Sequence, residues 1–539
     1  MLCDLTAVKM EDGNGGGENF IAGTALKTGE KNVSKELYHQ LRVLTWEKLW
    51  TDEVPRFNKA SPKERSERVA LVRAVGVVFF ESGDPKRREE VKLWLMGLLH
   101  DPCEKIRRYA MAALPKIGAG PDAEAELLAL LRNTSSGREK KFLVQALEKI
   151  GGTATLETMK EDSRALPPLT EQKLKASIAR SQSPSAIRLD GVLSDFAGLR
   201  VHLRGRRGLE AMVRDEAEQA IRTRGQFRLE GGRVGLVALT PLVPFTLSDI
   251  YALRCFGDVG FVPGGDTVAI KARSIEALAP IIASALSRRV LQAFTEGSIR
   301  YRLNFVGKGH QRGAVRLLAG RVYELCPEML NDARNVTWTV DIYPDSRVEL
   351  RPNLTPDPRF YYRRRDVPAA SHPPLAACMA RLAGLAENEI VWDPFCGSGL
   401  ELIERALLGG VRAIHGTDLS AAAIAIARDN FAAVRMQPVP ANFVCKDFRD
   451  YAGSLGPNSL TLVITNPPMG MRVPVPDLHG LIEELFNVAA TVLRPGGRLI
   501  LANPISMKNP PRPFQLLSRQ TVDLGGFDCL MEKYVKVGR

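Results

Sequence analysis

A glycine-rich motif in the last third of the chain can bring the backbone close to a ligand. It reads Asp393-Pro394-Phe395-Cys396-Gly397-Ser398-Gly399 and follows a short apolar run at 389–392. The glycines permit a tight turn between a strand and a helix. A pyrophosphate site would need G-x-G-x-x-G, whereas G-S-G after Asp-Pro suits a nucleoside ligand without pyrophosphate. The carboxylate of Asp393 can accept a hydrogen bond from an ammonium group of such a ligand.

Two further acidic residues follow the next two predicted strands. Asp418 ends Gly416-Thr417-Asp418, and an acid at the end of a second strand is placed to bind a ribose diol. Asp447 can accept from an adenine amino group while Phe448 or Leu419 covers the ring; the alternative is that Asp447 caps a helix. A nucleoside with an ammonium group and no pyrophosphate describes S-adenosyl-L-methionine. The predicted cofactor residues are Asp393, Pro394, Cys396, Gly397, Ser398, Gly399, Asp418, Leu419, Asp447 and Phe448.

A second motif, Thr465 to Arg472, can hold an exocyclic amine. Asn466 carries a carbonyl acceptor, and Pro467 and Pro468 stiffen the turn after it so that a backbone carbonyl points outward. Two acceptors would align the lone pair of a base amine with the sulfonium methyl group, so catalysis would be mostly orientation of the reactants. An uncharged aryl amine needs no strong general base before attack. We predict Asn466, Pro467, Pro468 and Met469 as the catalytic residues; the alternative is a structural turn.

Alternating strands and helices position these motifs. We predict strands at 389–392, 413–416, 443–445, 460–465 and 498–501, and helices at 399–408, 421–431 and 478–493. Such alternation predicts a parallel sheet covered on both faces. Because ligands of doubly wound folds bind at the carboxyl ends of the strands, the motifs are expected to meet there.

The region before this sheet is predicted to be α+β and basic. Strands are expected at 199–203, 234–239, 300–305 and 338–343, with helices near 212–221 and 314–325. Residues 191–380 hold 27 basic and 19 acidic side chains, and the whole chain of 539 residues has a net charge of +13. Such an excess favours a polyanionic partner such as nucleic acid, although a basic surface is also common in proteins without one. Basic candidates include Arg204, Arg206, Arg207, Arg300, Arg302, Lys308 and Arg312, and Arg363, Arg364 and Arg365 beside Tyr361 and Tyr362.

The first third is predicted to be helical after a disordered tail over 1–30. Ala113-Leu114-Pro115-Lys116-Ile117-Gly118 returns 33 residues later as Ala146-Leu147-Glu148-Lys149-Ile150-Gly151, and each copy is expected to end a helix at its glycine. The repeat favours HEAT-like stacked helices over 31–160 that dock protein or RNA, with a plain helical bundle as the alternative. Residues 161–190 have the composition of a linker.

These motifs together resemble those of the THUMP-containing RNA methyltransferases, which make N2-methylguanosine in tRNA or large-subunit rRNA. The resemblance covers about residues 195–539 and is strongest in DPFCGSGLELIERAL from Asp393, GTDLS from Gly416 and NPPMGMR from Asn466. The resemblance is weaker over 360–375, which looks like the segment before the catalytic sheet. It is weaker again at Leu253-Arg254 and over 301–352, which look like the ferredoxin-like and THUMP modules.

The resemblance implies methyl transfer to guanine N2 of tRNA, with rRNA as the second choice. Arg472 fits the family pattern, whereas the family usually has Tyr or Phe where this chain has Met469, and that ring would stack on a flipped base. The predicted RNA contacts are Arg300, Arg302, Lys308, Arg312, Tyr362, Arg363, Arg364, Arg365 and Arg472. Two other functions stay open: an N6-adenine DNA methyltransferase, and an inactive RNA-binding scaffold with the same fold.

The whole chain is therefore predicted to be multidomain. It would comprise N-terminal α-helical repeats, a central ferredoxin-like and THUMP-like α+β region at 191–358, and a C-terminal α/β class I (Rossmann-like) methyltransferase domain at 359–539. No run of about 18 apolar residues predicts a membrane span. The eight cysteines and seven histidines lack metal-site spacing, so no metal is expected. A cytoplasmic protein, with a possible protein partner for the helical repeats, is the resulting expectation.

Overall fold

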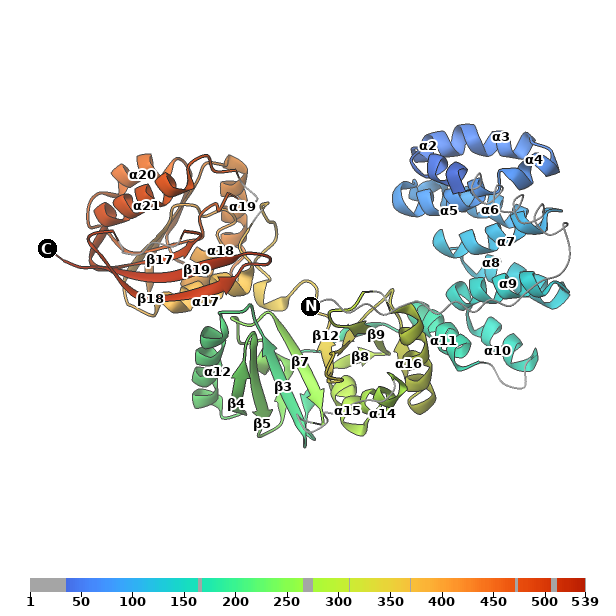
Figure 1. The fold of residues 1–539 in the computed structure, drawn as a ribbon, viewed down its shortest axis with the longest axis horizontal. Coiled ribbons are helices and arrows are strands. Elements are labelled where there is room, and N and C mark those ends of the chain that lie inside the picture. The colour runs from blue at the N-terminus through green and yellow to red at the C-terminus, as the bar shows by residue number, and fades with distance from the viewer. Residues whose placement is uncertain are drawn as a thin grey trace, which may run out of the picture. The chain divides into compact units, whose positions relative to one another are not determined.

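A computed structural model describes the chain over residues 35–162, 167–264, 275–309, 311–368, 370–470, 474–505 and 511–538. The chain divides into two compact units, residues 1–182 and 183–539, whose elements are labelled in Figure 1. The predicted tail at 1–30 lies outside the described residues. No helix in the described ranges has both the length and the apolar character needed to cross a membrane.

The first unit is helical, which confirms the predicted helical region. Helices α5, α7, α9 and α11 each pack against the next, so they follow one another as layers, with α8 beside α9 and α10 beside α11 (Figure 1). Charged side chains link successive layers, because Nε of Arg107 on α7 lies 2.6 Å from Oε1 of Glu139 on α9. The helices are α2 Trp46–Lys48, α3 Val54–Lys59, α4 Pro62–Glu67, α5 Ala70–Ser82, α6 Arg88–Gly97, α7 Glu104–Ala113, α8 Pro121–Asn133, α9 Gly137–Ile150, α10 Thr153–Asp162 and α11 Pro168–Gln182.

The two copies of the sequence repeat end their helices differently. Helix α9 runs to Ile150 and is capped by Gly151, as predicted. Helix α7 stops at Ala113, and a 3-10 turn over Leu114–Lys116 precedes Gly118, whose φ is +71°. The prediction for the first copy is thus wrong by several residues. Pro115 lacks the amide hydrogen that an α-helix needs, so the α-helix ends before it.

The segment predicted as a linker contains regular structure. Helix α10 ends at Asp162, and α11 occupies 168–182. Leu174 and Ala176 of α11 are buried, and Leu174 belongs to the core of the first unit. Because α11 packs on α9, most of the described part of this segment belongs to the helical unit, and composition alone was misleading here.

The second unit begins with an eight-stranded sheet in the order β10-β9-β11-β12-β7-β3-β5-β4. All strands and helices predicted here are present, with α12 packed on β4 and β5 (Figure 1). Strands β4, β7, β10 and β12 were not predicted. The sheet strands are β3 Leu199–Arg204, β4 Phe227–Arg233, β5 Leu236–Pro241, β7 Asp258–Pro263, β9 Ile299–Phe305, β10 Met329–Asn331, β11 Trp338–Ile342 and β12 Val348–Pro352; the helices are α12 Glu210–Arg224, α13 Leu247–Ile250, α14 Ala279–Ile282, α15 Ala285–Ala293 and α16 Arg312–Leu325.

Two small antiparallel pairs flank this sheet. Strand β1 pairs with β8, and β2 pairs with β6. Their bounds are β1 Ser185–Ile187, β2 Val192–Leu193, β6 Phe245–Thr246 and β8 Thr295–Gly297.

The last part of the chain forms a seven-stranded sheet in the order β15-β14-β13-β16-β17-β19-β18. The first five strands are parallel, which confirms the Rossmann-like sheet, whereas β19 runs antiparallel to both β17 and β18. The five predicted strands are the parallel ones, whereas β18 and β19 were not predicted. The strands are β13 Glu389–Asp393, β14 Val411–Asp418, β15 Ala441–Cys445, β16 Leu460–Thr465, β17 Leu493–Asn503, β18 Phe514–Asp523 and β19 Asp528–Lys536.

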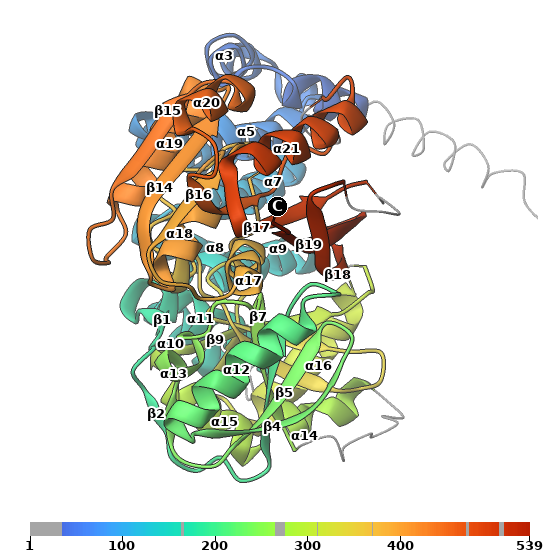
Figure 2. The same ribbon diagram turned by 90° about the vertical axis from the view of Figure 1, so that its left-hand side faces the viewer.

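Helices cover both faces of this sheet, because its apolar strand residues alternate between two cores. Val391 of β13 packs in the cluster that includes α17, α18 and α19, whereas the adjacent Trp392 packs in the cluster that includes α20 and α21. The elements can be followed in Figure 2. The helices are α17 Pro373–Ala383, α18 Leu400–Leu407, α19 Ala421–Ala432, α20 Phe448–Leu455 and α21 Leu478–Val492.

Buried ion pairs join the two sheets of the second unit. The guanidinium of Arg254 binds Glu404 of α18 through two hydrogen bonds, each 2.7 Å long. The hydroxyl of Tyr362 donates to the same carboxylate. This arrangement fixes the eight-stranded sheet against α18, the helix that follows the glycine-rich motif.

Candidate functional site

A cavity of about 900 Å³ opens at the carboxyl ends of β13, β14, β15 and β16. A doubly wound sheet places its ligand sites at this edge. Residues from all four strand ends line the cavity, which brings the two predicted motifs together. They include Pro394, Cys396, Gly397, Ser398, Asp418, Leu419, Asp447, Phe448, Asn466, Pro467, Pro468 and Met469.

The glycine-rich turn is fixed by Asp418. One carboxylate oxygen of Asp418 accepts from the amide of Gly397 at 3.1 Å, and the other accepts from the amide of Ser420 at 2.8 Å. Gly397 and Gly399 have φ of +50° and +83°, in the left-handed region that favours glycine. Ser398 is almost fully buried, and its hydroxyl has no hydrogen-bond partner within the described protein. The turn therefore places a free hydroxyl in the wall of the cavity.

Asp393 has a different position from the one predicted. It does not line the cavity, and one of its oxygens accepts from the amide of Phe395 at 3.0 Å and from the hydroxyl of Thr465 at 2.6 Å. Burial, together with the nearby carboxyl of Glu401, raises the pKa of Asp393 well above its ordinary value. Asp393 thus ties the ends of β13 and β16 together behind the cavity wall, and Gly399 is the N-cap residue of helix α18.

Asp447 and Phe448 take up the positions where the third strand ends. Asp447 accepts from the amide of Arg449 at 2.9 Å, so it has the helix-capping role considered as the alternative. Phe448 packs on Phe395 with ring centroids 5.0 Å apart, while Leu419 is largely exposed beside the cavity. Both apolar residues named for the ring of a nucleoside therefore border the same cavity.

Asn466 presents an unused acceptor at the end of β16. Its amide nitrogen donates to the hydroxyl of Ser371 at 2.7 Å, and its carbonyl oxygen is buried without a partner in the described structure. Pro467, Pro468 and Met469 continue along the cavity wall, where Met469 packs against the main apolar cluster. A buried acceptor without a partner costs about 1–3 kcal/mol, so the site favours a ligand that donates a hydrogen bond here.

Several lining residues were not foreseen from the sequence. Ser371 and Glu401 face each other across the cavity wall, and the hydroxyl of Ser371 donates to the carboxylate. Arg206, Leu524 and Phe527 line another side. The guanidinium of Arg206 donates to the backbone carbonyl of Asp523 at 3.2 Å, which anchors the turn between β18 and β19. Arg206 is one of the basic residues that the sequence indicates, whereas no local pattern marks Ser371, Glu401, Leu524 or Phe527, which meet only after folding.

Two of the residues predicted to contact RNA are buried, and six are exposed. Arg300 and Tyr362 are 1% and 0% exposed, so the prediction is wrong for both. Arg300 donates to the hydroxyl of Ser298 and to a backbone carbonyl, and Tyr362 donates to Glu404. Arg302, Lys308, Arg312, Arg363, Arg364 and Arg365 are exposed, whereas Arg472 lies outside the described residues.

Besides Arg207, which forms an exposed ion pair with Asp528, three basic candidates already have acidic partners. The exposed Arg365 pairs with Asp429, and Arg363 pairs with Asp366 while it also lines the cavity. Arg204 pairs with the buried Glu349. Arg204 is therefore held by the sheet, while the exposed pairs can rearrange at little cost.

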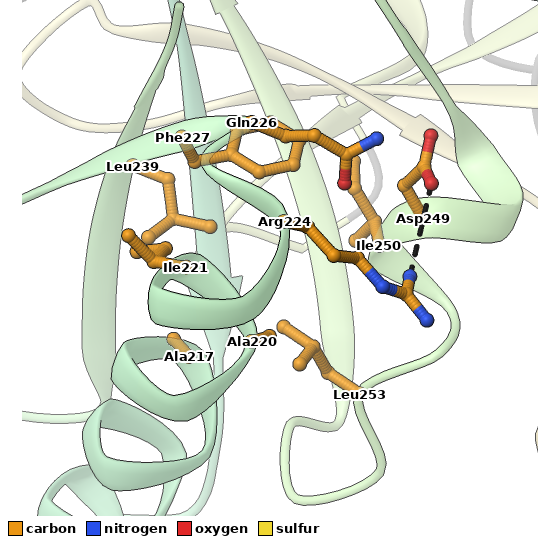
Figure 3. Close-up of a pocket in the computed structure, with 10 residues that line it drawn as sticks. All are labelled: Ala217, Ala220, Ile221, Arg224, Gln226, Phe227, Leu239, Asp249, Ile250 and Leu253. Atoms are coloured by element: carbon orange, nitrogen blue, oxygen red, sulfur yellow. Dashed lines mark ion pairs between the residues drawn. The ribbon is translucent and has the colours of Figure 1, made fainter.

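A second hollow, beside α12, is far smaller. It encloses about 20 Å³ and is lined largely by apolar side chains, with Arg224 and Asp249 pointing toward one another at 3.7 Å (Figure 3). A space of this size holds about one water molecule. It is too small for a nucleoside or a base.

Part of this chain is similar to known methyltransferases. Residues 361–510 match a family described as an RMKL-like methyltransferase domain. A segment of 181 residues, 33% of this chain, is 27% identical to the tRNA (guanine(10)-N2)-dimethyltransferase of Methanothermobacter thermautotrophicus and covers 49% of it. The chain thus spans about half the length of this relative. These matches, at low identity, show that part of this chain is similar to methyltransferases.

Two solved structures match part of this chain. TrmN from Thermus thermophilus is 20% identical, with a TM-score of 0.48, and the match covers 63% of this chain and 100% of that protein. A putative methyltransferase complexed with SAH is 15% identical, with a TM-score of 0.46, and the match covers 65% of this chain and 99% of that protein.

Proposed function

We propose that this chain transfers a methyl group from S-adenosyl-L-methionine to an exocyclic amine of RNA, with guanine N2 of tRNA as the substrate and rRNA as the second choice. The observation that carries the proposal is the carbonyl oxygen of Asn466, a buried acceptor without a partner in the described structure. It lies in the same cavity wall as the glycine-rich turn. An amine donor is the complement of that acceptor.

The residues present fit the cofactor. The cavity of about 900 Å³ lies at the upper end of the usual size range of ligand sites and leaves space for a nucleoside beside a base. The Ser398 hydroxyl has no partner in the described structure, and the left-handed Gly397 keeps the turn free of a side chain. We assign the ribose to Asp418, the adenine to Leu419 and Phe448, and the ammonium group to backbone carbonyls of the glycine-rich turn. When bound, S-adenosyl-L-methionine supplies an electrophilic methyl group.

The protein would act on the amine mainly by orientation. The Asn466 carbonyl and the backbone carbonyl of Pro467 would accept the two amine hydrogens, which directs the nitrogen lone pair toward the methyl group. The neighbouring Cys396 is buried, and its pKa is raised well above its ordinary value by burial and by Asp393, so it stays a neutral thiol. No group in this arrangement has to remove a proton before attack.

Charge and relatives support RNA as the acceptor. The exposed Arg302, Lys308 and Arg312 belong to the region with 27 basic against 19 acidic residues. A relative that matches 181 residues of this chain is named for methylation of a tRNA guanine. Arginine and lysine bind phosphate without reading sequence, so they would position RNA while the cavity selects the base. The central THUMP-like region and the HEAT-like repeats are part of this proposal as RNA-docking and partner-docking modules.

The test is transfer of a labelled methyl group to purified RNA. We expect incorporation into tRNA as N2-methylguanosine, and loss of at least about 100-fold in rate for Asn466→Ala. The exposed Asn487 on α21 offers a matched control, because Asn487→Ala removes the same side chain away from the cavity. Incorporation into DNA alone would favour the N6-adenine alternative. Cofactor binding by calorimetry without transfer to any nucleic acid would instead favour an inactive scaffold.

A further inference from the structure

Three polar side chains form a hydrogen-bond chain in the cavity wall. The amide nitrogen of Asn466 lies 2.7 Å from the hydroxyl oxygen of Ser371, and the Ser371 hydroxyl binds Oε1 of Glu401. The three residues come from the end of β16, the segment before α17 and the first turn of α18. All three line the cavity.

Counting protons shows which end of the amide must face Ser371. Oε1 of Glu401 accepts the single proton of the Ser371 hydroxyl. The Ser371 oxygen is then left to accept, and only the NH₂ end of Asn466 can donate to it. The carbonyl end of Asn466 therefore has to point away from Ser371, and it is the atom without a partner in the described structure.

The alternative orientation would remove the acceptor. A side-chain amide turned over would present NH₂ to an incoming amine, so two donors would face each other and neither could bind. We propose that Ser371 is a positioning residue, which together with Glu401 keeps the carbonyl of Asn466 directed at the target amine. This inference rests on the proposed function.

The surroundings of Glu401 argue against a purely structural carboxylate. The residue is 4% exposed, and its neighbours Leu400, Leu402 and Ile403 are buried apolar residues. Within the described residues no cation lies within ion-pair distance of it, and its side chain's only hydrogen bond to another residue there goes to Ser371. A buried carboxylate without a cation is costly, and an apolar residue would pack here more cheaply. This cost is explained if the carboxylate of Glu401 determines the direction of the hydrogen bonds that run from Asn466 through Ser371.

The experiment compares Ser371→Ala with Ser371→Thr in single-turnover methyl transfer at saturating tRNA. We expect Ser371→Ala to lower the rate by about 10- to 100-fold, as the loss of one oriented hydrogen bond implies, and Ser371→Thr to recover most of it because it keeps the hydroxyl. Dissociation constants for cofactor and tRNA should stay within about twofold of the wild-type values, since neither ligand is held by this hydroxyl. Glu401→Gln should lower the rate as well, because a Gln amide can also donate to Ser371.

Ser459→Ala is the matched control, since that partly buried hydroxyl donates only to the carbonyl of Gly456, at 3.0 Å, in the loop before β16. A wild-type rate for Ser371→Ala would overturn the positioning role while leaving methyl transfer standing. Equal losses in Ser371→Ala and Ser371→Thr, with weakened cofactor binding, would also overturn it and indicate a structural role. Absence of transfer by the wild-type chain would overturn the proposed function and this inference together.

Discussion

The helical unit and the cavity of the second unit differ in whether their buried polar groups have hydrogen-bond partners. In the helical unit, Glu124 of α8 accepts from the hydroxyl of Thr155 at 2.6 Å and from the amide of Gly152 at 2.7 Å, and Arg107 binds Glu139. Around the cavity, the carbonyl of Asn466 and the hydroxyl of Ser398 have no partner in the described protein. The polar groups named in the helical unit are completed by neighbouring residues, whereas the two at the cavity have no partner in the described protein, and we expect a ligand to complete them.

The largest effect is expected for Asn466→Ala, which tests the difference between the two regions. The rate of methyl transfer should fall by at least about 100-fold, whereas the free energy of unfolding should stay within about 1 kcal/mol, because the truncated acceptor was unsatisfied in the folded protein. Chemical denaturation of the same preparation used for the rate checks this. A stability loss as large as the rate loss would mean that Asn466 is mainly structural.

The opposite result is expected for Arg107→Ala in the helical unit. Removing the guanidinium leaves the mostly buried carboxylate of Glu139 without its cation, which should cost the helical unit about 2–3 kcal/mol. Cofactor affinity measured by calorimetry should not change. Arg42→Ala, at the exposed pair with Glu81, should cost well under about 1 kcal/mol and serves as the control.

A smaller effect is expected for Phe527→Ala at the edge of the cavity. If its ring contacts the target base, the KM for tRNA should rise about tenfold, in line with the 1–3 kcal/mol of base stacking. The cofactor dissociation constant should be unchanged, and Phe527→Tyr should behave like the wild type. An unchanged KM would assign the base contact to other lining residues.

The smallest effect is expected for Met469→Tyr. The thioether of Met469 can pack on a base, but an aromatic ring stacks more strongly. We expect tRNA affinity to rise about threefold, equivalent to roughly 0.6 kcal/mol. A large fall in affinity would show that the cavity is shaped around methionine.

The sequence predicts the parallel part of the catalytic sheet because four of its five strands end at, or are directly followed by, an Asp or Asn, and apolar runs lie within them. Strand β18 cannot be predicted in this way because its residues Gln515, Ser518 and Arg519 are exposed at the sheet edge. The strand therefore has no apolar run. The motifs at Gly397 and Asn466 were found by residue type and spacing, and the structure brings them to one cavity.

Contacts between distant residues could not be predicted in this way. Ser371 and Glu401 are 30 positions apart, and nothing in either local sequence marks the pair. Tyr362 stands in a run of arginines that looks like an exposed basic patch, yet its ring is buried because Glu404, 42 residues further on, accepts its hydroxyl. Residue type indicated chemistry, while only the fold decided which groups face the cavity.

The turn between β18 and β19 has a consequence for how the protein is made. Its residues Leu524 and Phe527 close one side of the cavity, and Arg206 from the central sheet anchors it by a bond that spans 317 positions of the chain. Synthesis proceeds from the N-terminus, so the glycine-rich turn and Asn466 leave the ribosome before this wall exists. A nascent chain that has not yet released β19 would carry both motifs, but the side of the cavity formed by Leu524 and Phe527 would be missing.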